Sequence, residues 1–351
     1  QRVAIRWAEG YCRSANLSHH DLAARLKKPD GKTYSPDSVY HMFTGGREAD
    51  QLENMVAALE RLREVETERA GQVRVDFIET SLSRRIFAVC RRAFLRQKIV
   101  MIYGDSQIGK TTALLEYASR HNHGETRYVR MPPGGGCDSF VRELAEVLGI
   151  PMYARSSELR RRIIDCFDSR MLLIVDECEE CLTDRAGSAK GVMTLNFIRE
   201  IHDKKKCGVV LAGANIFKKR LLYGHNAPSM QRLIRRGMIP LQLPAYPPQA
   251  DLALFAEAYR LPPIRAEKIG VRVTTCDDQG NERTDTLEQS PLELQNQIVR
   301  THGLGRWCMI LQEASDIARE RRKGISWGLV LHAWHTFELL EKFADEEAAT
   351  P

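Results

Sequence analysis

The stretch Ile99-Val-Met-Ile-Tyr-Gly-Asp-Ser-Gln-Ile-Gly-Lys-Thr-Thr112 decides the fold of this chain. Its first five residues are apolar, as in a buried strand. The next eight, Gly104 to Thr111, match the pattern G-x-x-x-x-G-K-[ST] at every fixed position. A helix with apolar periodicity follows. Strand, loop and helix together are the context in which this pattern binds phosphate, so a plain glycine-rich turn is disfavoured.

The chemistry of phosphate binding explains the residue types in this loop. Two glycines let the backbone curl so that its N–H groups face a phosphate, and the helix start adds partial positive charge. We expect Lys110 to reach the β- and γ-phosphates of ATP and the Thr111 hydroxyl to bind Mg²⁺. The expected nucleotide contacts are Gly104, Asp105, Ser106, Gln107, Ile108, Gly109, Lys110, Thr111 and Thr112.

Strands and helices alternate beyond this loop. The expected strands are 99–103, 126–131, 171–176, 207–212 and 238–243, and the expected helices between them are 111–120, 138–148, 157–168 and 190–203. This alternation is typical of an α/β fold with a parallel five-stranded sheet covered by helices on both faces.

The third expected strand ends in two acidic residues, Asp176 and Glu177. We expect this strand to lie beside strand 99–103. Asp176 would then position Mg²⁺ through water, and Glu177 would orient and polarise an attacking water. An Asp-Glu pair is a weak signal alone, but its position after the phosphate loop in a βα alternation strengthens it.

The chain divides into four segments by composition. Residues 1–62 are predicted to form a small helical domain, and residues 63–95 a charged linker with a leading helix. Residues 96–244 hold the nucleotide-binding domain. Residues 245–351 are predicted to form a helical lid, interrupted by an inserted hairpin at 264–290.

Two short helices around a turn in the N-terminal segment resemble a helix-turn-helix of the phage-repressor type. In that arrangement the second helix would place Ser38 and His41 near DNA, with Tyr34 and Ser35 at its start. The segment is barely basic and its turn is long. A helical protein-interaction domain is therefore an equally weighted alternative.

Composition excludes several classes of protein. The chain has 351 residues, 43% of them hydrophobic, and no apolar run long enough for a transmembrane helix. Nine scattered cysteines predict reduced thiols in a cytoplasmic protein. Cys178 and Cys181 have metal-like spacing without a second pair, so zinc is not expected, and neither are ligands among His332, His335 and Glu338.

Positive charge is concentrated in the middle of the chain. Residues 63–302 carry a net charge of +7, against +1 for residues 1–62 and −2 for residues 303–351. This favours a polyanionic partner such as duplex DNA. The basic candidates for DNA contact are Arg185, Lys190, Lys204, Lys205, Lys206, Lys218, Lys219 and Arg220. The alternative for each is a solvated helix end.

Three further polar positions are candidates for the nucleotide site. Asn215 follows a buried strand and is either a contact to the γ-phosphate or lytic water, or a turn residue. Arg306 begins a lid helix from which it would reach over the phosphates. Arg232, with Arg235 and Arg236, is a candidate arginine finger acting on a neighbouring subunit.

With these pieces placed, the chain resembles the AAA+ family, and within it the transposition ATPases of the group that includes Mu B protein, TnsC and IstB. The motifs that carry the resemblance, in order, are the helix-turn-helix-like segment, Phe77-Ile-Glu-Thr80, the phosphate loop, Asp176-Glu177 and Gly303-x-x-Arg306. The resemblance implies that Phe77 and Ile78 lie near the nucleotide base. It also makes Asn215 similar to sensor 1, Arg232 to the arginine finger and Arg306 to sensor 2.

Members of that group bind duplex DNA when ATP is bound, assemble on it as filaments or rings, and recruit or activate a transposase. The resemblance therefore implies an ATPase that uses ATP and Mg²⁺, binds DNA with little sequence preference, and acts as a homo-oligomer with a transposase as partner. Two alternatives stay open: an initiator or helicase loader of DNA replication, and a signalling P-loop switch that binds no DNA.

Overall fold

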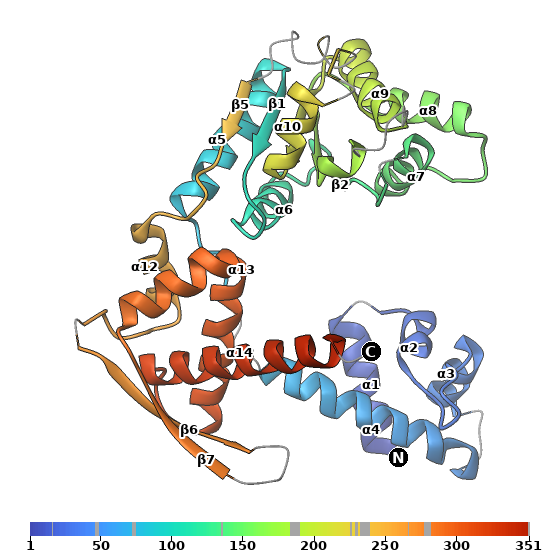
Figure 1. Cartoon of the computed structure of the whole chain (residues 1–351). Coiled ribbons are helices and arrows are strands. Elements are labelled where there is room, and N and C mark those ends of the chain that lie inside the picture. The colour runs from blue at the N-terminus through green and yellow to red at the C-terminus, as the bar shows by residue number, and fades with distance from the viewer. Residues whose placement is uncertain are drawn as a thin grey trace. The chain divides into compact units, whose positions relative to one another are not determined.

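The computed structural model is shown in Figure 1. It describes residues 1–15, 17–45, 49–71, 75–134, 136–182, 190–224, 227–228, 231, 239–265, 267–276 and 282–349. The chain forms two compact units, residues 1–74 and residues 75–351. Each unit is described by itself below.

The N-terminal unit consists of four helices, α1 (Arg2–Ser14), α2 (His19–Arg25), α3 (Pro36–Thr44) and α4 (Ala49–Gly71). The predicted caps form: Ser18 makes a capping box with Asp21, and Ser35 caps α3. The expected linker from residue 63 is wrong up to Gly71, because α4 continues through it. Arg63 and Glu64 in this part of α4 are exposed.

The second unit contains the predicted parallel sheet. Its strands are β1 (Ile99–Tyr103), β2 (Thr126–Arg130), β3 (Leu172–Asp176), β4 (Gly208–Gly213) and β5 (Ile239–Gln242). They are all parallel and follow the order β2-β3-β4-β1-β5. The predicted α/β fold class is confirmed.

The order of the strands corrects one expectation. We expected β3 to lie beside β1, but β4 pairs with both and separates them. Strand order depends on where each crossover helix packs, and apolar alternation along the chain carries no information about it. The consequence is that the end of β4, and the helix α10 (Asn215–Tyr223) that follows it, lie between the phosphate loop and Asp176.

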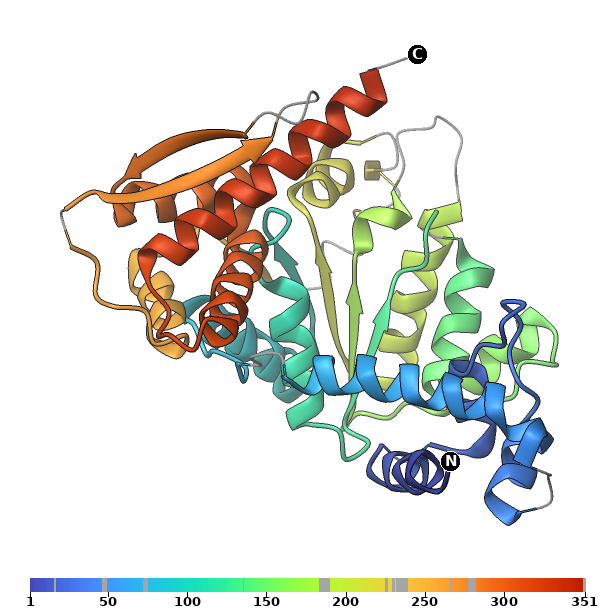
Figure 2. The same ribbon diagram turned by 90° about the horizontal axis from the view of Figure 1, so that it is seen from below.

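Alternate side chains of the strands enter two separate cores, as the two-residue period of a strand requires. Helices α5 (Ser81–Arg96) and α6 (Lys110–Arg120) cover one face. The other face is covered by α7 (Cys137–Val147), α8 (Ser156–Asp165), α9 (Lys190–Lys205) and α10. Figure 2 shows the sheet with helices on either side.

The C-terminal part of this unit is the predicted helical lid with its hairpin. It comprises α12 (Gln249–Ala258), β6 (Ile269–Cys276), β7 (Glu282–Gln289), α13 (Pro291–Glu320) and α14 (Trp327–Ala349). Strands β6 and β7 pair antiparallel, and their turn lies outside the described residues. Gly303, with φ 83° and ψ 178°, breaks α13 between the two helices we expected there.

None of the helices that the structure describes is long and apolar enough to cross a membrane.

Candidate nucleotide site

The phosphate loop joins β1 to α6 in the form that the sequence predicts. Gly109 has φ 92° and caps the start of α6, where a side chain would be strained. The Lys110 ammonium donates hydrogen bonds to the carbonyl oxygens of Gly104 at 2.9 Å and Asp105 at 2.8 Å. The loop backbone thus wraps around the cation that would meet the phosphates.

Burial lowers the pKa of Lys110 from its ordinary value of 10.5, and the nearby carboxylate of Glu179, followed by that of Asp176, opposes the shift. The Lys110 residue as a whole is 9% exposed. A buried cation beside the backbone N–H groups at the start of α6 favours the binding of an anion next to Lys110.

Asp176, at the end of β3, contacts Thr111 of α6 although β4 lies between β3 and β1. The buried Asp176 carboxylate accepts hydrogen bonds from the Thr111 hydroxyl at 2.7 Å and from the Tyr128 hydroxyl at 3.1 Å. Its other oxygen accepts from the Glu177 backbone N–H at 2.9 Å. A carboxylate and a hydroxyl side by side are hard oxygen donors, and this pair fits Mg²⁺.

The Glu177 carboxylate is paired with an arginine that sequence reasoning missed. Its backbone takes φ 56°, and its carboxylate forms a two-pronged ion pair with Arg130 at the end of β2. Glu177 in turn raises the pKa of Arg130 above its ordinary value. The register of β2 with β3 places Arg130 opposite Asp176, which is information about pairing that the sequence alone does not contain.

Asn215 is brought to the phosphate loop. It begins α10, donates to the Asp105 carboxylate at 2.5 Å, and accepts from the Gln242 amide at 2.8 Å. Gln242, at the end of β5, also accepts from the Lys218 ammonium at 2.9 Å. A polar chain therefore crosses the carboxyl edge of β4, β1 and β5, and Asn215 lies at its centre.

An apolar pocket of about 380 Å³ opens beside the loop. Three parts of the chain line it: the segment before and into α5, the loop with the start of α6, and the lid. Phe77, Ile78, Leu82, Ile86, Ile108, Phe255, Tyr259 and Leu304 supply most of its apolar wall. Its size, its apolar character and its position next to the loop suit a nucleotide base and ribose.

The lid touches the loop directly. The Gly305 N–H donates to the Gln107 carbonyl at 3.2 Å, and Leu304 lines the pocket. Arg306, which we expected over the phosphates, points elsewhere. Its guanidinium forms an ion pair with Glu341 of α14 and lies 5.3 Å from the centre of the Phe337 ring. The structure thus brings the backbone of this motif to the loop, but not its arginine.

The predicted DNA contacts are scattered. Arg185 lies outside the described residues, as does the side chain of Lys190, the first residue of α9. The candidates for the arginine finger, Arg232, Arg235 and Arg236, lie outside them as well. Lys204 pairs with Glu200 at 2.7 Å and Lys205 with Asp165 at 3.4 Å. Both lysines precede β4 and therefore lie at the sheet edge opposite the phosphate loop.

The two contacts predicted in the N-terminal unit lie on α3. The Ser38 hydroxyl is 2.8 Å from that of Ser35, and His41 is exposed beside the Tyr40 ring. The connection between α2 and α3 contains a small antiparallel bridge between Lys27 and Thr33. The helix-turn-helix assignment stays a prediction.

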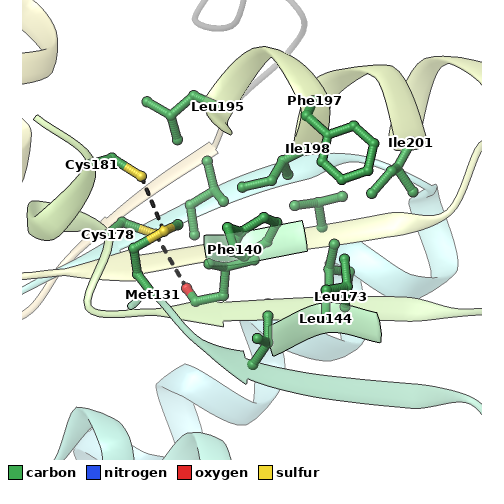
Figure 3. Packing of buried hydrophobic residues seen from close by; sticks show 14 of the residues in the cluster. Met131, Phe140, Leu144, Leu173, Cys178, Cys181, Leu195, Phe197, Ile198 and Ile201 are labelled. Carbon is green, nitrogen blue, oxygen red and sulfur yellow. Dashed lines mark hydrogen bonds between the residues drawn. The ribbon is translucent and has the colours of Figure 1, made fainter. Parts of the chain in front are cut away.

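The cysteines after Glu177 belong to a core. Cys178 and Cys181 bound a short 3-10 helix and point into the cluster shown in Figure 3. The Cys178 thiol donates to the Val175 carbonyl at 3.3 Å, and the Cys181 sulfur lies 3.3 Å from that of Met131. Burial raises the pKa of both thiols, so they are neutral packing groups.

A family model described as "AAA domain" matches residues 92–221. The matched region contains the loop, both acidic residues and Asn215. These residues are therefore similar to an AAA domain. The same segment begins within α5 and ends within α10, so it contains four of the five strands described above.

The curated proteins similar to this chain include a DNA transposition protein and a target DNA activator. It is 29% identical over 139 residues to "Mu-like prophage FluMu DNA transposition protein B" of Haemophilus influenzae, covering 39% of this chain and 45% of that protein. It is 27% identical over 165 residues to "ATP-dependent target DNA activator B" of Escherichia phage Mu, covering 46% and 49%. The resemblance to the Mu B group is confirmed at modest identity. The chain spans just under half the length of these relatives.

Among solved structures, the Walker-type ATPase PABY2304 of Pyrococcus abyssi aligns at 12% identity with a TM-score of 0.46. The alignment covers 78% of this chain and 76% of that chain.

Proposed function

We propose that this chain is a DNA-binding ATPase of transposition that binds duplex DNA with little sequence preference when ATP is bound, oligomerises on it, and directs a transposase to the target. One observation carries the proposal: Lys110 and the Thr111–Asp176 pair lie beside a base-sized pocket in an AAA domain. Relatives named for DNA transposition and for ATP-dependent target DNA activation point to the same role.

The residues of the site have separate tasks in this proposal. Lys110 binds the β- and γ-phosphates, and Thr111 and Asp176 hold Mg²⁺. The ion would supply charge stabilisation at the phosphates. Glu177 orients the attacking water once it leaves Arg130, and Asn215 contacts the γ-phosphate or that water.

The lid and a neighbouring subunit complete the site in the oligomer. Arg306 turns from Glu341 toward the phosphates when nucleotide binds, and Arg232 of one subunit acts on the nucleotide of the next. A nucleotide shared between subunits couples ATP binding to assembly, because only the ATP-bound state supports the contact. Hydrolysis then resets the assembly.

We also propose that residues 96–244 are the nucleotide-binding domain and residues 245–351 its lid, and that the N-terminal unit, residues 1–74, is a helix-turn-helix-like module that contacts DNA or a protein partner. The basic excess of residues 63–302 supports contact of the remaining chain with phosphates. A polymer that follows phosphates does not read bases, so binding should depend on salt and hardly on sequence.

The decisive measurement is the binding of a fluorescent duplex, followed by anisotropy, with and without a slowly hydrolysed ATP analogue. We expect binding only with nucleotide, and loss of binding in Lys110→Ala. Arg161→Ala is the matched control, since this exposed cation pairs with Glu158 on α8, away from the site. Equal binding without nucleotide, or by Lys110→Ala, would refute the proposal.

Other results of these measurements would favour the two alternative functions, a P-loop switch and a helicase loader. Nucleotide binding without any DNA binding would favour the P-loop switch. ATP-gated DNA binding followed by association with a purified replicative helicase, and not with a transposase, would favour the loader. Negative-stain images of the DNA complex test assembly directly, because filaments or rings should appear only with nucleotide.

A further inference from the structure

Helix α5 carries an unusual concentration of positive charge. Its sixteen residues include five arginines and no acidic residue. All five arginine side chains are exposed: Arg84, Arg85, Arg91, Arg92 and Arg96. We call these five residues the arginine face. In the printed sequence they stand as two pairs and a single residue, and so form no long basic run.

The spacing of these arginines places them on one side of the helix. At about 100° per residue, the five positions fall within an arc of about 140°. The opposite side is buried against the sheet and α6 through Leu82, Ile86, Cys90 and Ala93. Figure 1 shows α5 running along the sheet beside β1. The five arginines thus share one side of the helix, with the exposed Leu95 among them.

The arginine face has no acidic partner within the described part of the chain. Arg85 donates a long hydrogen bond of 3.4 Å to the Gln242 carbonyl, and none of the five forms an ion pair there. Other arginines of the same unit behave differently, since Arg120, Arg161 and Arg162 are all paired with glutamates. Five clustered cations without counter-charges repel one another, which costs stability unless an anion binds them.

The charge continues past the end of α5. Lys98 precedes β1 and Lys206 precedes β4. Burial lowers the pKa of His202, and the positive charges of Lys206 and Lys98 lower it further, so both cations lie near this residue. Lys98 and Lys206 are exposed and, like the arginine face, form no ion pair within the part of the chain that the structure describes. The basic surface therefore extends to the amino edge of the sheet.

We infer that the arginine face is a contact surface for the phosphate backbone of duplex DNA. This inference rests on the proposed function and names the surface that carries it. From Arg84 to Arg96 the helix rises about 18 Å, the length of about five phosphates along one DNA strand. Arginine matches phosphate geometry with two parallel N–H donors, which makes five of them on one face a fit for regularly spaced anions.

The opposite side of α5 explains why this contact would depend on ATP. Thr80, which caps α5, lines the nucleotide pocket together with Leu82, Ser83 and Ile86 from its first two turns. One helix therefore lines the nucleotide pocket with one side and presents the arginine face on the other. Closure of the lid on a bound nucleotide would fix α5, and with it the five cations, in one position.

The test is a triple variant, Arg85→Ala with Arg92→Ala and Arg96→Ala, measured for binding to a fluorescent duplex in the presence of a slowly hydrolysed ATP analogue. We expect affinity to fall by at least tenfold near physiological salt. The slope of log affinity against log salt should decrease by about 2 to 3, since each lost phosphate contact removes about 0.9. Replacing the same three residues with lysine should retain most of the binding.

A matched control removes the same charge elsewhere. Arg155, Arg161 and Arg170 are exposed residues of the same unit, and their triple alanine variant should bind DNA like the parent. Thermal unfolding of both variants checks that each is folded.

Three outcomes would overturn the inference. The first is that the α5 variant keeps the parental salt slope, and the second is that both triple variants lose affinity equally. The third is that the parent assembles with the ATP analogue in the absence of DNA and the α5 variant does not, which would make the face a contact between copies of the chain. Failure of the proposed function would look different, since the parent itself would then not bind DNA with ATP.

Discussion

The ion pair between Arg130 and Glu177 predicts a variant that hydrolyses ATP faster. In the proposed mechanism Glu177 must face the attacking water, but its carboxylate is held by both prongs of the Arg130 guanidinium. Each turnover therefore requires the pair to open. Arg130→Ala removes the competing partner and leaves the carboxylate free.

The size of the effect follows from the exposure of the pair. The side chains of Arg130 and Glu177 are 66% and 32% exposed, so water screens them. Exposed ion pairs contribute about 0.2–1 kcal/mol, and the two-pronged geometry places this pair toward the upper end. Converted to populations, the pair restrains Glu177 by about 1.4- to 5-fold. We expect kcat of Arg130→Ala to rise by a factor in that range.

The assay is steady-state phosphate release at saturating ATP, with and without DNA. Arg130→Lys keeps a single-pronged contact and should fall between the parent and Arg130→Ala. Arg161→Ala, a similarly exposed pair on α8, should leave kcat unchanged. A kcat that is unchanged or lower in Arg130→Ala would refute the reasoning, because Arg130 would then support catalysis and not restrain Glu177.

Three further predictions concern the lid, the core and pH. Gly303→Ala should weaken ATP binding and lower the free energy of unfolding by about 1–3 kcal/mol, because φ is 83° at this position and a Cβ would lie 2.9 Å from the Gln107 side chain of the phosphate loop. Gly324→Ala is the control, since a Cβ there meets nothing within 4 Å. Equal effects of the two substitutions in calorimetry would refute this prediction. Asp251→Ala should lower the melting temperature of the second unit by about 5–10 °C, because the buried carboxylate accepts two hydrogen bonds from Ser81 at 2.8 Å; an unchanged melt would contradict it. ATP affinity should decline as the pH rises, and the decline should begin at a lower pH than the ordinary lysine pKa of 10.5 would give. Burial lowers the pKa of Lys110, so its positive charge is lost at a lower pH than that of an exposed lysine. An ATP affinity that does not change with pH in a fluorescence binding assay would count against this prediction.

The parts of the site that could be predicted are those with a local signal. The phosphate loop needs a strand before it, glycines within it and a helix after it, and all three are contiguous in sequence. Asp176 could be placed at a strand end because five apolar residues precede it. Backbone geometry then brings Thr111 and Asp176 within 2.7 Å, as their expected shared role requires.

The parts that could not be predicted depend on which elements become neighbours. The order of the strands, and so the place of β4 between β1 and β3, is set by crossover packing. Tyr128 and Arg130 reach the acidic pair only because β2 pairs with β3 in one register. Arg306 turns to Glu341 because α14 folds back along α13, a contact between residues 35 positions apart.

The unpaired cations of the fold are not the ones that stand out in the sequence. Basic runs such as Lys204–Lys206 attract attention in a sequence, but Lys204 and Lys205 are neutralised by acidic neighbours in the fold. Arginines at helical spacing are dispersed in the sequence and gather only when the helix forms. The helical spacing of the apolar residues of α5 predicts which side is buried. The arginines repeat at the same helical spacing on the opposite side.

An arrangement with the nucleotide pocket on one side of α5 and cations on the other constrains how ATP and DNA can influence each other. Binding energies that couple through one helix must be reciprocal, so DNA on the arginine face would tighten ATP binding by the same factor by which ATP tightens DNA binding. The Asp251 carboxylate of α12 accepts two hydrogen bonds from Ser81 at the start of α5, so this helix connects the lid to both the pocket and the arginine face. Equal coupling factors measured in both directions, and the loss of both in the α5 triple alanine variant, are what this geometry requires.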